Sequence, residues 1–226
     1  MFIIINDIVR NMPKVFILVI IVAFTIRPIS YGQEINYASF GIETNNSNIP
    51  HGLKVGDKAR NFTGYDQKGK QVELKKLLEH GPVILFFYRG NWCPECNKYL
   101  RDYQDSIKIL TDQGFILVAI TPESIENVEQ TAKLHNLTFT VIYDCQEKIM
   151  NDFDVMFNVT KAYQDKILSD FSIDIAKING REAARLPVPA TYIINREGNI
   201  VAVQFDPNYK NRASVKWMLK NLGAAL

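Results

Sequence analysis

The sequence has 226 residues, of which 47% are hydrophobic and 22% are charged, fractions typical of a globular protein. They exclude a disordered chain, a collagen-like repeat and a coiled coil, and the length allows one large domain with a leader or two small domains. The first 32 residues account for the formal net charge of +2, since the remainder has 23 basic and 23 acidic residues and therefore no large cationic field for nucleic acid or anionic lipid.

The amino-terminal segment predicts an export signal. Two basic residues precede a twelve-residue apolar stretch, 15–26, which is too short to span a bilayer core of roughly 30 Å. Ser30 and Gly32 are small residues suited to positions −3 and −1 of a cleavage site. We predict a signal peptide over 1–32 and export to the periplasm or cell envelope of a bacterium. An uncleaved membrane anchor and a buried helix are the alternatives.

One domain is predicted after a linker. The segment 33–51 is polar and predicts a flexible linker. Residues 52–226 form the predicted domain. Its first element is a hairpin of strands 62–65 and 71–74, with Gly69 in the turn.

Uninterrupted apolar runs predict strands that are buried on both faces. They lie at 83–88 and 115–120, and a short third strand is predicted at 140–143. An apolar stripe predicts one helix over 94–113, and a second helix is predicted with Thr121 as its N-cap.

The last third of the chain predicts short helices in an insertion, a hairpin and a terminal helix. The insertion spans 151–186, the hairpin strands are 191–195 and 200–205, and the terminal helix has an apolar stripe over 215–222. This order predicts an α/β fold, with a central mixed sheet flanked by helices. The functional site is expected at the carboxyl end of the first central strand.

Two cysteines follow that strand. Cys93 is predicted at or beside the N-cap of the helix, where free N–H groups and the helix dipole stabilise a thiolate, with Pro94 at the first helical position. Cys96 lies one turn later on the same face, so the pair can close a disulfide. Cys93 is therefore the predicted exposed nucleophile and Cys96 the more buried resolving thiol. The charge of Glu95 is expected to raise the pKa of Cys93 and favour a more reducing couple.

A static disulfide and a metal site are the alternatives to redox use of the two thiols. Zinc requires four ligands, and the remaining candidates, Cys145 and the three histidines, have no recognisable spacing. We predict redox use, with no metal and no cofactor. Cys145 is interpreted as a small buried residue, with a second resolving cysteine as the alternative.

The sequence Phe-Phe-Tyr-Arg-Gly-Asn-Trp-Cys-Pro-Glu-Cys at 86–96 resembles the active-site segment of the peroxiredoxin-like branch of the thioredoxin fold, the alkyl hydroperoxide reductase C and thiol-specific antioxidant superfamily. Segments 53–62, 186–194 and 206–209 are also similar to that superfamily, and the likeness covers about 52–226. The resemblance implies a thioredoxin fold with an added N-terminal hairpin, and thiol-dependent antioxidant activity.

The active-site segment departs from typical peroxiredoxins in one respect. Their threonine, which holds the peroxide, stands three residues before the nucleophile, where this chain has Gly90. Arg89 is a candidate for the positive charge, or is a surface cation at a strand end. The Trp-Cys-Pro-x-Cys form resembles exported thioredoxin-like disulfide reductases.

The resemblance also implies roles around the cysteines. Pro189 is the predicted cis-proline, with Pro187 as the alternative, and the backbone groups of Val188 are expected to be free to pair with a substrate chain. Trp92 is predicted to cover the Cys93 sulfur or to serve in packing.

The predicted function is hydroperoxide reduction by an exported enzyme that is monomeric or weakly dimeric. Cys93 becomes sulfenic acid, Cys96 condenses with it, and a thioredoxin-like donor reduces the disulfide. The alternatives are disulfide exchange on protein substrates and a copper or zinc carrier.

Overall fold

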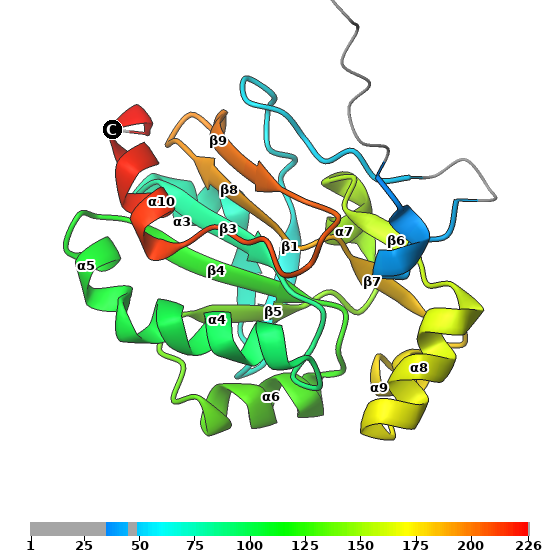
Figure 1. The fold of residues 1–226 in the computed structure, drawn as a ribbon. Coiled ribbons are helices and arrows are strands. Elements are labelled where there is room, and N and C mark those ends of the chain that lie inside the picture. The colour runs from blue at the N-terminus through cyan, green and yellow to red at the C-terminus, as the bar shows by residue number, and fades with distance from the viewer. Residues whose placement is uncertain (1–34, 45–48, 226) are drawn as a thin grey trace, which may run out of the picture. The chain divides into compact units, whose positions relative to one another are not determined.

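A computed structural model describes residues 35–44 and 49–225. Figure 1 shows a central sheet with helices on both faces and a smaller strand pair beside it. The predicted signal peptide, 1–32, lies outside the described residues.

The central sheet is mixed, as predicted. Its strand order is β2-β1-β5-β4-β3-β8-β9. The pairs β3–β4 and β4–β5 are parallel, and the other pairs are antiparallel. The strands are β1 (Thr63–Asp66), β2 (Gln71–Glu73), β3 (Val83–Phe87), β4 (Ile116–Thr121), β5 (Thr140–Tyr143), β8 (Ala190–Ile194) and β9 (Ile200–Phe205).

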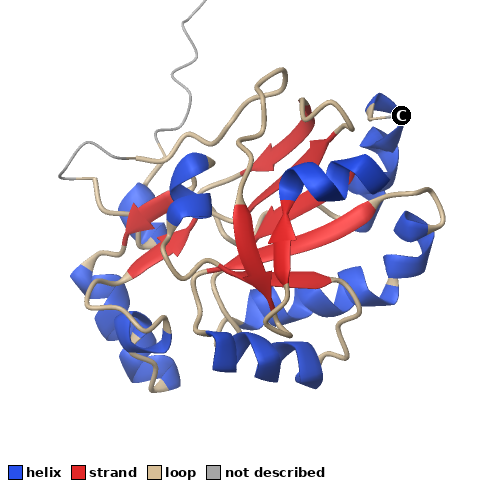
Figure 2. Cartoon of the chain, turned by 180° about the vertical axis from the view of Figure 1, so that it is seen from behind, coloured by secondary structure: helices blue, strands red, loops and turns tan. Residues whose placement is uncertain are grey.

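Helices cover both faces of this sheet (Figures 1 and 2). Helices α4, α5, α6 and α10 pack on one face, and α3 and α7 pack on the other. Their bounds are α3 (Leu74–His80), α4 (Pro94–Asp105), α5 (Ile107–Thr111), α6 (Ile125–Leu134), α7 (Lys148–Asp152) and α10 (Val215–Asn221). The α/β fold class predicted from the sequence is confirmed.

Strand β3 is buried along its whole length. Successive side chains of a strand point to opposite faces, so Ile84 and Phe86 join the core beneath α4, while Leu85 and Phe87 join the core beneath α3. Phe86 meets Tyr103 of α4 edge to face, with ring centroids 4.9 Å apart. Packing on both faces fixes the end of β3, from which the cysteine segment extends.

The predicted insertion contains strands as well as helices. Strands β6 (Met156–Asn158) and β7 (Arg185–Pro187) form an antiparallel pair. Helices α8 (Lys161–Phe171) and α9 (Ile175–Ile178) lie together at one side of the molecule (Figure 1). Three-residue strands are too short to show an alternating pattern, which is why the sequence indicated only helices here.

Two predicted helix boundaries are wrong. The single helix predicted over 94–113 is interrupted at Ser106 (φ −102°, ψ 2°), so α4 and α5 are separate. Helix α6 has Ser124 as its N-cap, whereas the predicted cap, Thr121, is the last residue of β4. Thr121 pairs with Tyr143 of β5, and this sheet pairing extends the strand past the expected cap.

The described part of the predicted linker, 33–51, is packed on the domain. Residues Tyr37–Phe40 form a short 3₁₀ helix, η1, and Ile42 is buried and bridges to Val159. This part is therefore not a flexible linker, because Ile42 is buried and the backbone on either side of it hydrogen-bonds to Asn158 and Thr160.

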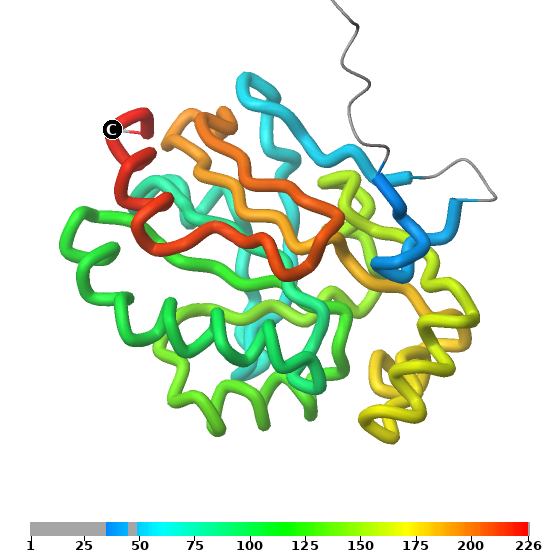
Figure 3. The backbone as a smooth tube through the Cα atoms, viewed as in Figure 1, coloured from blue at the N-terminus to red at the C-terminus, as the bar shows by residue number. Residues whose placement is uncertain are grey.

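The connection from β9 to α10 turns back along the sheet (Figure 3). It enters α10 through Ser214, an N-cap whose hydroxyl accepts a hydrogen bond from the N–H of Trp217 at 3.1 Å. Just before the cap, the hydroxyl of Tyr103 donates to the carbonyl oxygen of Ala213 at 2.5 Å. This contact attaches the connection to α4, the helix that begins beside Cys93.

Candidate active site

Cys93 and Cys96 lie where β3 leads into α4. Cys93 is the N-cap of α4, with extended backbone (φ −91°, ψ 113°), and Pro94 begins the helix, as predicted. Both cysteines are free thiols, 1% and 0% exposed. The prediction that Cys93 is exposed is therefore wrong, because its side chain belongs to the same buried core cluster as Trp92 and Tyr163.

Arg89 donates to the first cysteine. Its Nη2 is 3.2 Å from Sγ of Cys93, and its Nη1 donates to the hydroxyl of Tyr163 at 2.8 Å. The Arg89 side chain is buried, so the alternative prediction of a surface cation at the strand end is wrong. A buried guanidinium with no carboxylate partner among the described ion pairs favours a thiolate beside it.

Aromatic rings surround this guanidinium. The guanidinium carbon of Arg89 lies 3.8 Å from the ring centroid of Tyr209, 5.3 Å from that of Trp92 and 5.7 Å from that of Tyr163. A cation is attracted to the face of an aromatic ring, most strongly where water is excluded. The rings therefore hold the charge of Arg89 at Cys93.

A second arginine, which the sequence analysis missed, contacts the second cysteine. Arg212 precedes α10, and its Nη2 is 3.2 Å from Sγ of Cys96. Its Nε donates to the carbonyl oxygen of Tyr209 at 2.9 Å, and its guanidinium carbon lies 5.5 Å from the ring centroid of Tyr99. The sequence signal was close by, since the similar segment 206–209 ends three residues before Arg212.

The two thiols share a hydrogen bond and affect each other's ionisation. Burial opposes ionisation of Cys96, but the hydrogen bond from Cys93 and the charges of Arg212 and Arg89 lower the pKa of the Cys96 thiol. The same hydrogen bond, followed by burial, raises the pKa of Cys93 against the opposing effect of Arg89. In the reduced pair these effects favour the thiolate on Cys96 over the thiolate on Cys93.

Gly90 occupies the place of the threonine of typical peroxiredoxins. Its φ of +147° lies in the range that side-chain-bearing residues rarely adopt. A Cβ atom there would stand 2.5 Å from Nε1 of Trp92 and 2.8 Å from Oε1 of Glu123. The space for a threonine side chain is thus already filled, which explains the departure seen in the sequence.

Glu123, also missed by the sequence analysis, lies beneath the cysteine segment. The residue follows β4, is 1% exposed, and accepts a hydrogen bond from the N–H of Asn91 at 3.0 Å. Burial raises the pKa of the Glu123 carboxyl to about 8, against the opposing hydrogen bond from Asn91. At neutral pH the carboxyl is therefore mostly protonated and supports the loop without a buried negative charge.

Two neighbours of Cys93 in the motif differ in their surroundings. Trp92 is buried, with its indole nitrogen above Gly90. Glu95 is half-buried in the first turn of α4, and it makes no hydrogen bond or ion pair with any residue of 35–44 or 49–225. The charged groups that contact the sulfurs are the two arginines, and the predicted influence of Glu95 stays a prediction.

The proline segment does not match its predicted geometry. Among the described residues no peptide bond is cis, so the prediction of a cis bond at Pro189, or at Pro187, is wrong. The N–H of Val188 donates to the carbonyl oxygen of Val155 at 2.7 Å, so it is not free for a substrate chain. Pairing of β7 with β6 carries the chain straight into β8 and uses this group.

Cys145 is exposed in the turn after β5. Its interpretation as a small buried residue is wrong. Asp144 takes the buried position instead, and its carboxylate accepts a hydrogen bond from the N–H of Met150 at 2.8 Å.

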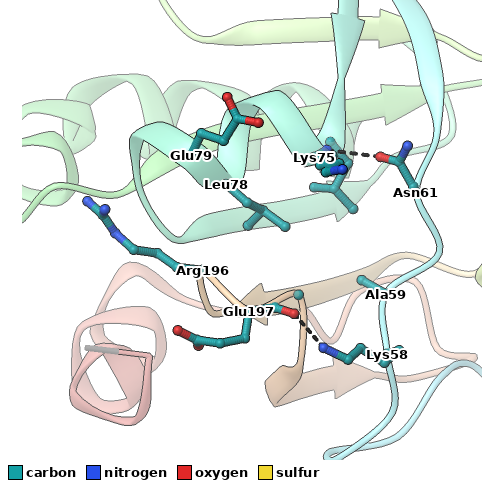
Figure 4. A pocket seen from close by; sticks show the side chains of 10 residues that line it. Lys58, Ala59, Asn61, Lys75, Leu78, Glu79, Arg196 and Glu197 are labelled. Atoms are coloured by element: carbon teal, nitrogen blue, oxygen red, sulfur yellow. Dashed lines mark hydrogen bonds between the residues drawn. The ribbon is translucent and has the colours of Figure 1, made fainter.

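A pocket of about 380 Å³ lies between α3, residues 58–61 and the turn between β8 and β9 (Figure 4). Leu74 and Leu78 form part of its lining, with side chains of both charges around them. No residue of the cysteine site lines it, and we assign no reaction to it.

Residues 35–44 and 49–225 contain no group of three or more histidine, cysteine, aspartate or glutamate side chains placed to hold a metal ion. The same residues contain no helix of the length and hydropathy needed to cross a membrane.

Comparison with known proteins places both cysteines inside a family match. The model of the AhpC/TSA family matches residues 55–203. Thiol-disulfide oxidoreductase ResA of Bacillus subtilis (strain 168) is 27% identical over 152 residues, which are 67% of this chain and 67% of that protein. Peroxiredoxin Bcp of the same strain is 28% identical over 127 residues, 54% of this chain and 79% of that protein.

Solved structures share the fold. Peroxidoxin BcpB from Mycobacterium tuberculosis has a TM-score of 0.59 and 20% identity, over 76% of this chain and 96% of that chain. A putative protein disulfide isomerase from Bacteroides thetaiotaomicron has a TM-score of 0.54 and 20% identity, over 79% of this chain and 94% of that chain. The mixed sheet flanked by helices is therefore the thioredoxin-like fold of these proteins.

Proposed function

This chain belongs to the AhpC/TSA family and is a thiol-dependent oxidoreductase, and we propose that it reduces hydroperoxides by cycling Cys93 and Cys96 between dithiol and disulfide. A thioredoxin-like donor restores the dithiol. The peroxiredoxin relatives support both the oxidant and the donor.

One observation carries the choice of oxidant: Cys93 is buried and its sulfur accepts from Arg89 at 3.2 Å. A hydroperoxide is small enough to reach a thiol beneath side chains, so the oxidation can occur with Cys93 covered. Exchange with a polypeptide, whether as substrate or as donor, requires the side chains over the sulfur to move aside. The guanidinium also places a positive charge where the oxygen–oxygen bond must break and an alkoxide must form.

The reaction requires the thiolate on Cys93. The charge of Arg89 and its hydrogen bond to Sγ favour that thiolate, which forms when the proton of the coupled pair passes from Cys93 to Cys96. The Cys93 thiolate attacks the terminal peroxide oxygen, the oxygen–oxygen bond breaks, and the alkoxide takes a proton from water to become the alcohol. Cys93 is then a sulfenic acid.

Cys96 completes the oxidation. Its thiolate attacks the Cys93 sulfur, the disulfide forms, and hydroxide leaves and is protonated to water. The peroxide has gained two electrons and the pair has lost two. The donor dithiol returns them by two thiol–disulfide exchanges.

Stopped-flow measurement tests the proposal. The reduced full chain is mixed with cumene hydroperoxide and, separately, with insulin as a protein disulfide, and oxidation of the pair is followed. Cys93→Ser is expected to abolish turnover, and Cys96→Ser is expected to accumulate sulfenic acid on Cys93, detected by mass spectrometry. Oxidation that is no faster than that of free cysteine would refute peroxide reduction.

Disulfide exchange with protein substrates is the second candidate. Gly90 removes the threonine hydroxyl that typical peroxiredoxins use, and ResA, one of the relatives, is a thiol-disulfide oxidoreductase. For this activity the side chains that bury Cys93, Arg89 among them, must move away from its sulfur. Fast reduction of insulin with slow reaction toward the hydroperoxide would favour this candidate.

Export is a separate proposal about residues 1–32. It is supported by the apolar stretch 15–26 and the small residues before position 33. Amino-terminal sequencing of protein exported by a bacterial host should begin near Gln33. Recovery of the intact chain in the membrane fraction would contradict cleavage.

A further inference from the structure

Arg212 has the Cys96 sulfur as its partner. Its Nη2 donates to Sγ of Cys96 at 3.2 Å, and its Nε donates to a backbone carbonyl oxygen. Arg212 takes part in none of the ion pairs found in the described part of the chain. A hydrogen bond from a guanidinium is strongest to a charged acceptor, so the contact favours the thiolate of Cys96.

Polar side chains shape the segment that carries Arg212. Asp206 accepts hydrogen bonds on both oxygens, from the N–H of Asn208 at 2.8 Å and from Nδ2 of Asn211 at 2.9 Å. Asn208 in turn accepts from the N–H of Lys210 at 3.2 Å. These contacts close the turn and reduce the freedom of the residues just before Arg212.

Helix α4 fixes the other end of this segment. Tyr103 is buried in α4, and its hydroxyl donates to the carbonyl oxygen of Ala213. Cys96 is on the same helix, so the residue next to Arg212 is attached to the element that carries the sulfur. The arginine is therefore placed against Cys96 by the fold, with little entropy left to lose when the thiolate forms.

We propose that Arg212 is a catalytic residue of the reductive half of the cycle, where it stabilises the leaving thiolate of Cys96. The inference rests on the Cys93–Cys96 cycle proposed above. A donor thiolate bonds to the Cys93 sulfur, the Cys93–Cys96 bond breaks, and its electron pair goes to Cys96. A second donor thiolate then displaces Cys93 as a thiolate and leaves the donor oxidised. A thiol with a lower pKa is the faster leaving group.

The geometry gives each sulfur its own arginine. Arg89 contacts Cys93, which reacts with the oxidant, and Arg212 contacts Cys96, which departs when the disulfide is reduced. Substitution of Arg212 should therefore slow reduction of the disulfide without slowing attack on a Cys93 mixed disulfide that has another leaving group.

The test compares two reactions that attack the same sulfur, both in a Cys145→Ser background that removes the exposed thiol. In the first, dithiothreitol reduces the Cys93–Cys96 disulfide, which is formed beforehand with diamide. In the second, dithiothreitol attacks a Cys93–thionitrobenzoate mixed disulfide in the Cys96→Ser variant, where the coloured thiolate leaves. Arg212→Gln should slow the first reaction by about tenfold or more and leave the second unchanged. Arg212→Lys, which keeps a charge, should recover part of the rate.

Arg101→Gln is the matched control, because Arg101 is an exposed arginine of α4, the helix that carries Cys96. This substitution should change neither rate. Equal slowing of both reactions by Arg212→Gln would show a general effect on the Cys93 environment and overturn the inference. An unchanged first reaction would overturn it as well. Neither reaction uses peroxide, so failure of the hydroperoxide reaction would leave this comparison intact.

Discussion

The face of the Tyr209 ring lies 3.8 Å from the guanidinium carbon of Arg89. The carbonyl oxygen of the same tyrosine accepts a hydrogen bond from Arg212. One residue of the connection before α10 therefore touches both arginines, and each arginine donates to one cysteine sulfur. The connection before α10 therefore contacts both positive charges of the site, although it is more than 100 residues from the cysteines in the sequence.

Substitution of Arg89 should slow the reaction of Cys93 with hydroperoxide. A hydrogen bond to a charged group contributes about 1.5–3 kcal/mol, so Arg89→Gln is expected to lower the second-order rate constant about 10- to 100-fold. Arg89→Lys should retain part of the rate. Stopped-flow fluorescence of the reduced protein measures this, with Arg101→Gln as an exposed control. A rate equal to that of the unsubstituted chain would show that the guanidinium has no part in the reaction.

Gly90 should tolerate no side chain. The Cβ of Gly90→Ala would meet Trp92 and Glu123 at less than 3 Å and would also require an unfavourable φ, so we expect a loss of about 2–4 kcal/mol in the free energy of unfolding. Gly69→Ala is the matched control, because Gly69 also has a positive φ (+72°) but no atom within 4 Å of its Cβ position. Its cost should be only about 1 kcal/mol of backbone strain. Urea unfolding measures both, and equal losses would mean that the cysteine segment moves aside.

The sequence predicted the parts of the fold that depend on local pattern. The apolar runs of β3 and β4 and the position of Cys93 as an N-cap follow from neighbouring residues. The arginine at Cys96 could not be predicted in this way, since Arg212 is 116 positions away and its contact depends on how the β9–α10 connection returns over the sheet. Helix boundaries failed where tertiary pairing overrode local preference, as at Thr121.

The burial of individual charged side chains could not be predicted from the sequence either. Glu123 stands in a segment that reads as an ordinary helix start, and only the packing of Gly90 and Asn91 above it shows why the carboxyl is enclosed. From the sequence, Arg89 could supply positive charge to the site or lie on the surface at a strand end. Its buried hydrogen bond to Tyr163 of α8 favours the first interpretation.

Cys145 should be the first thiol to react with an alkylating reagent in the native reduced protein. It is exposed, whereas Cys93 and Cys96 are covered. Brief treatment with iodoacetamide followed by peptide mass spectrometry should find the label mainly on Cys145, and protein unfolded in urea should be labelled on all three cysteines. Labelling of Cys93 as fast as Cys145 would show that the cover over the site opens readily, which favours protein disulfides as substrates.

Ionisation of Glu123 should make the stability of the protein fall as pH rises. Burial raises its pKa from 4.5 to about 8 in the folded chain. Below pH 4.5 the carboxyl is protonated in both the folded and the unfolded chain, so its burial does not lower the free energy of unfolding. Between the two values the unfolded chain releases the proton and the folded chain keeps it. The free energy of unfolding then falls by about 1.4 kcal/mol per pH unit. The loss is complete above about pH 8 and should amount to a few kcal/mol.

Glu123→Gln removes this titration and keeps an oxygen that can accept the hydrogen bond from Asn91. Urea unfolding of the reduced protein, at intervals between about pH 5 and about pH 9, should therefore show a shallower pH dependence for the variant than for the unsubstituted chain. Glu182→Gln, at an exposed position, should leave the original slope in place. Parallel curves for Glu123→Gln and the unsubstituted chain would mean that Glu123 is already ionised at neutral pH. The carboxylate would then place a negative charge beneath the cysteine segment and oppose the two arginines above it.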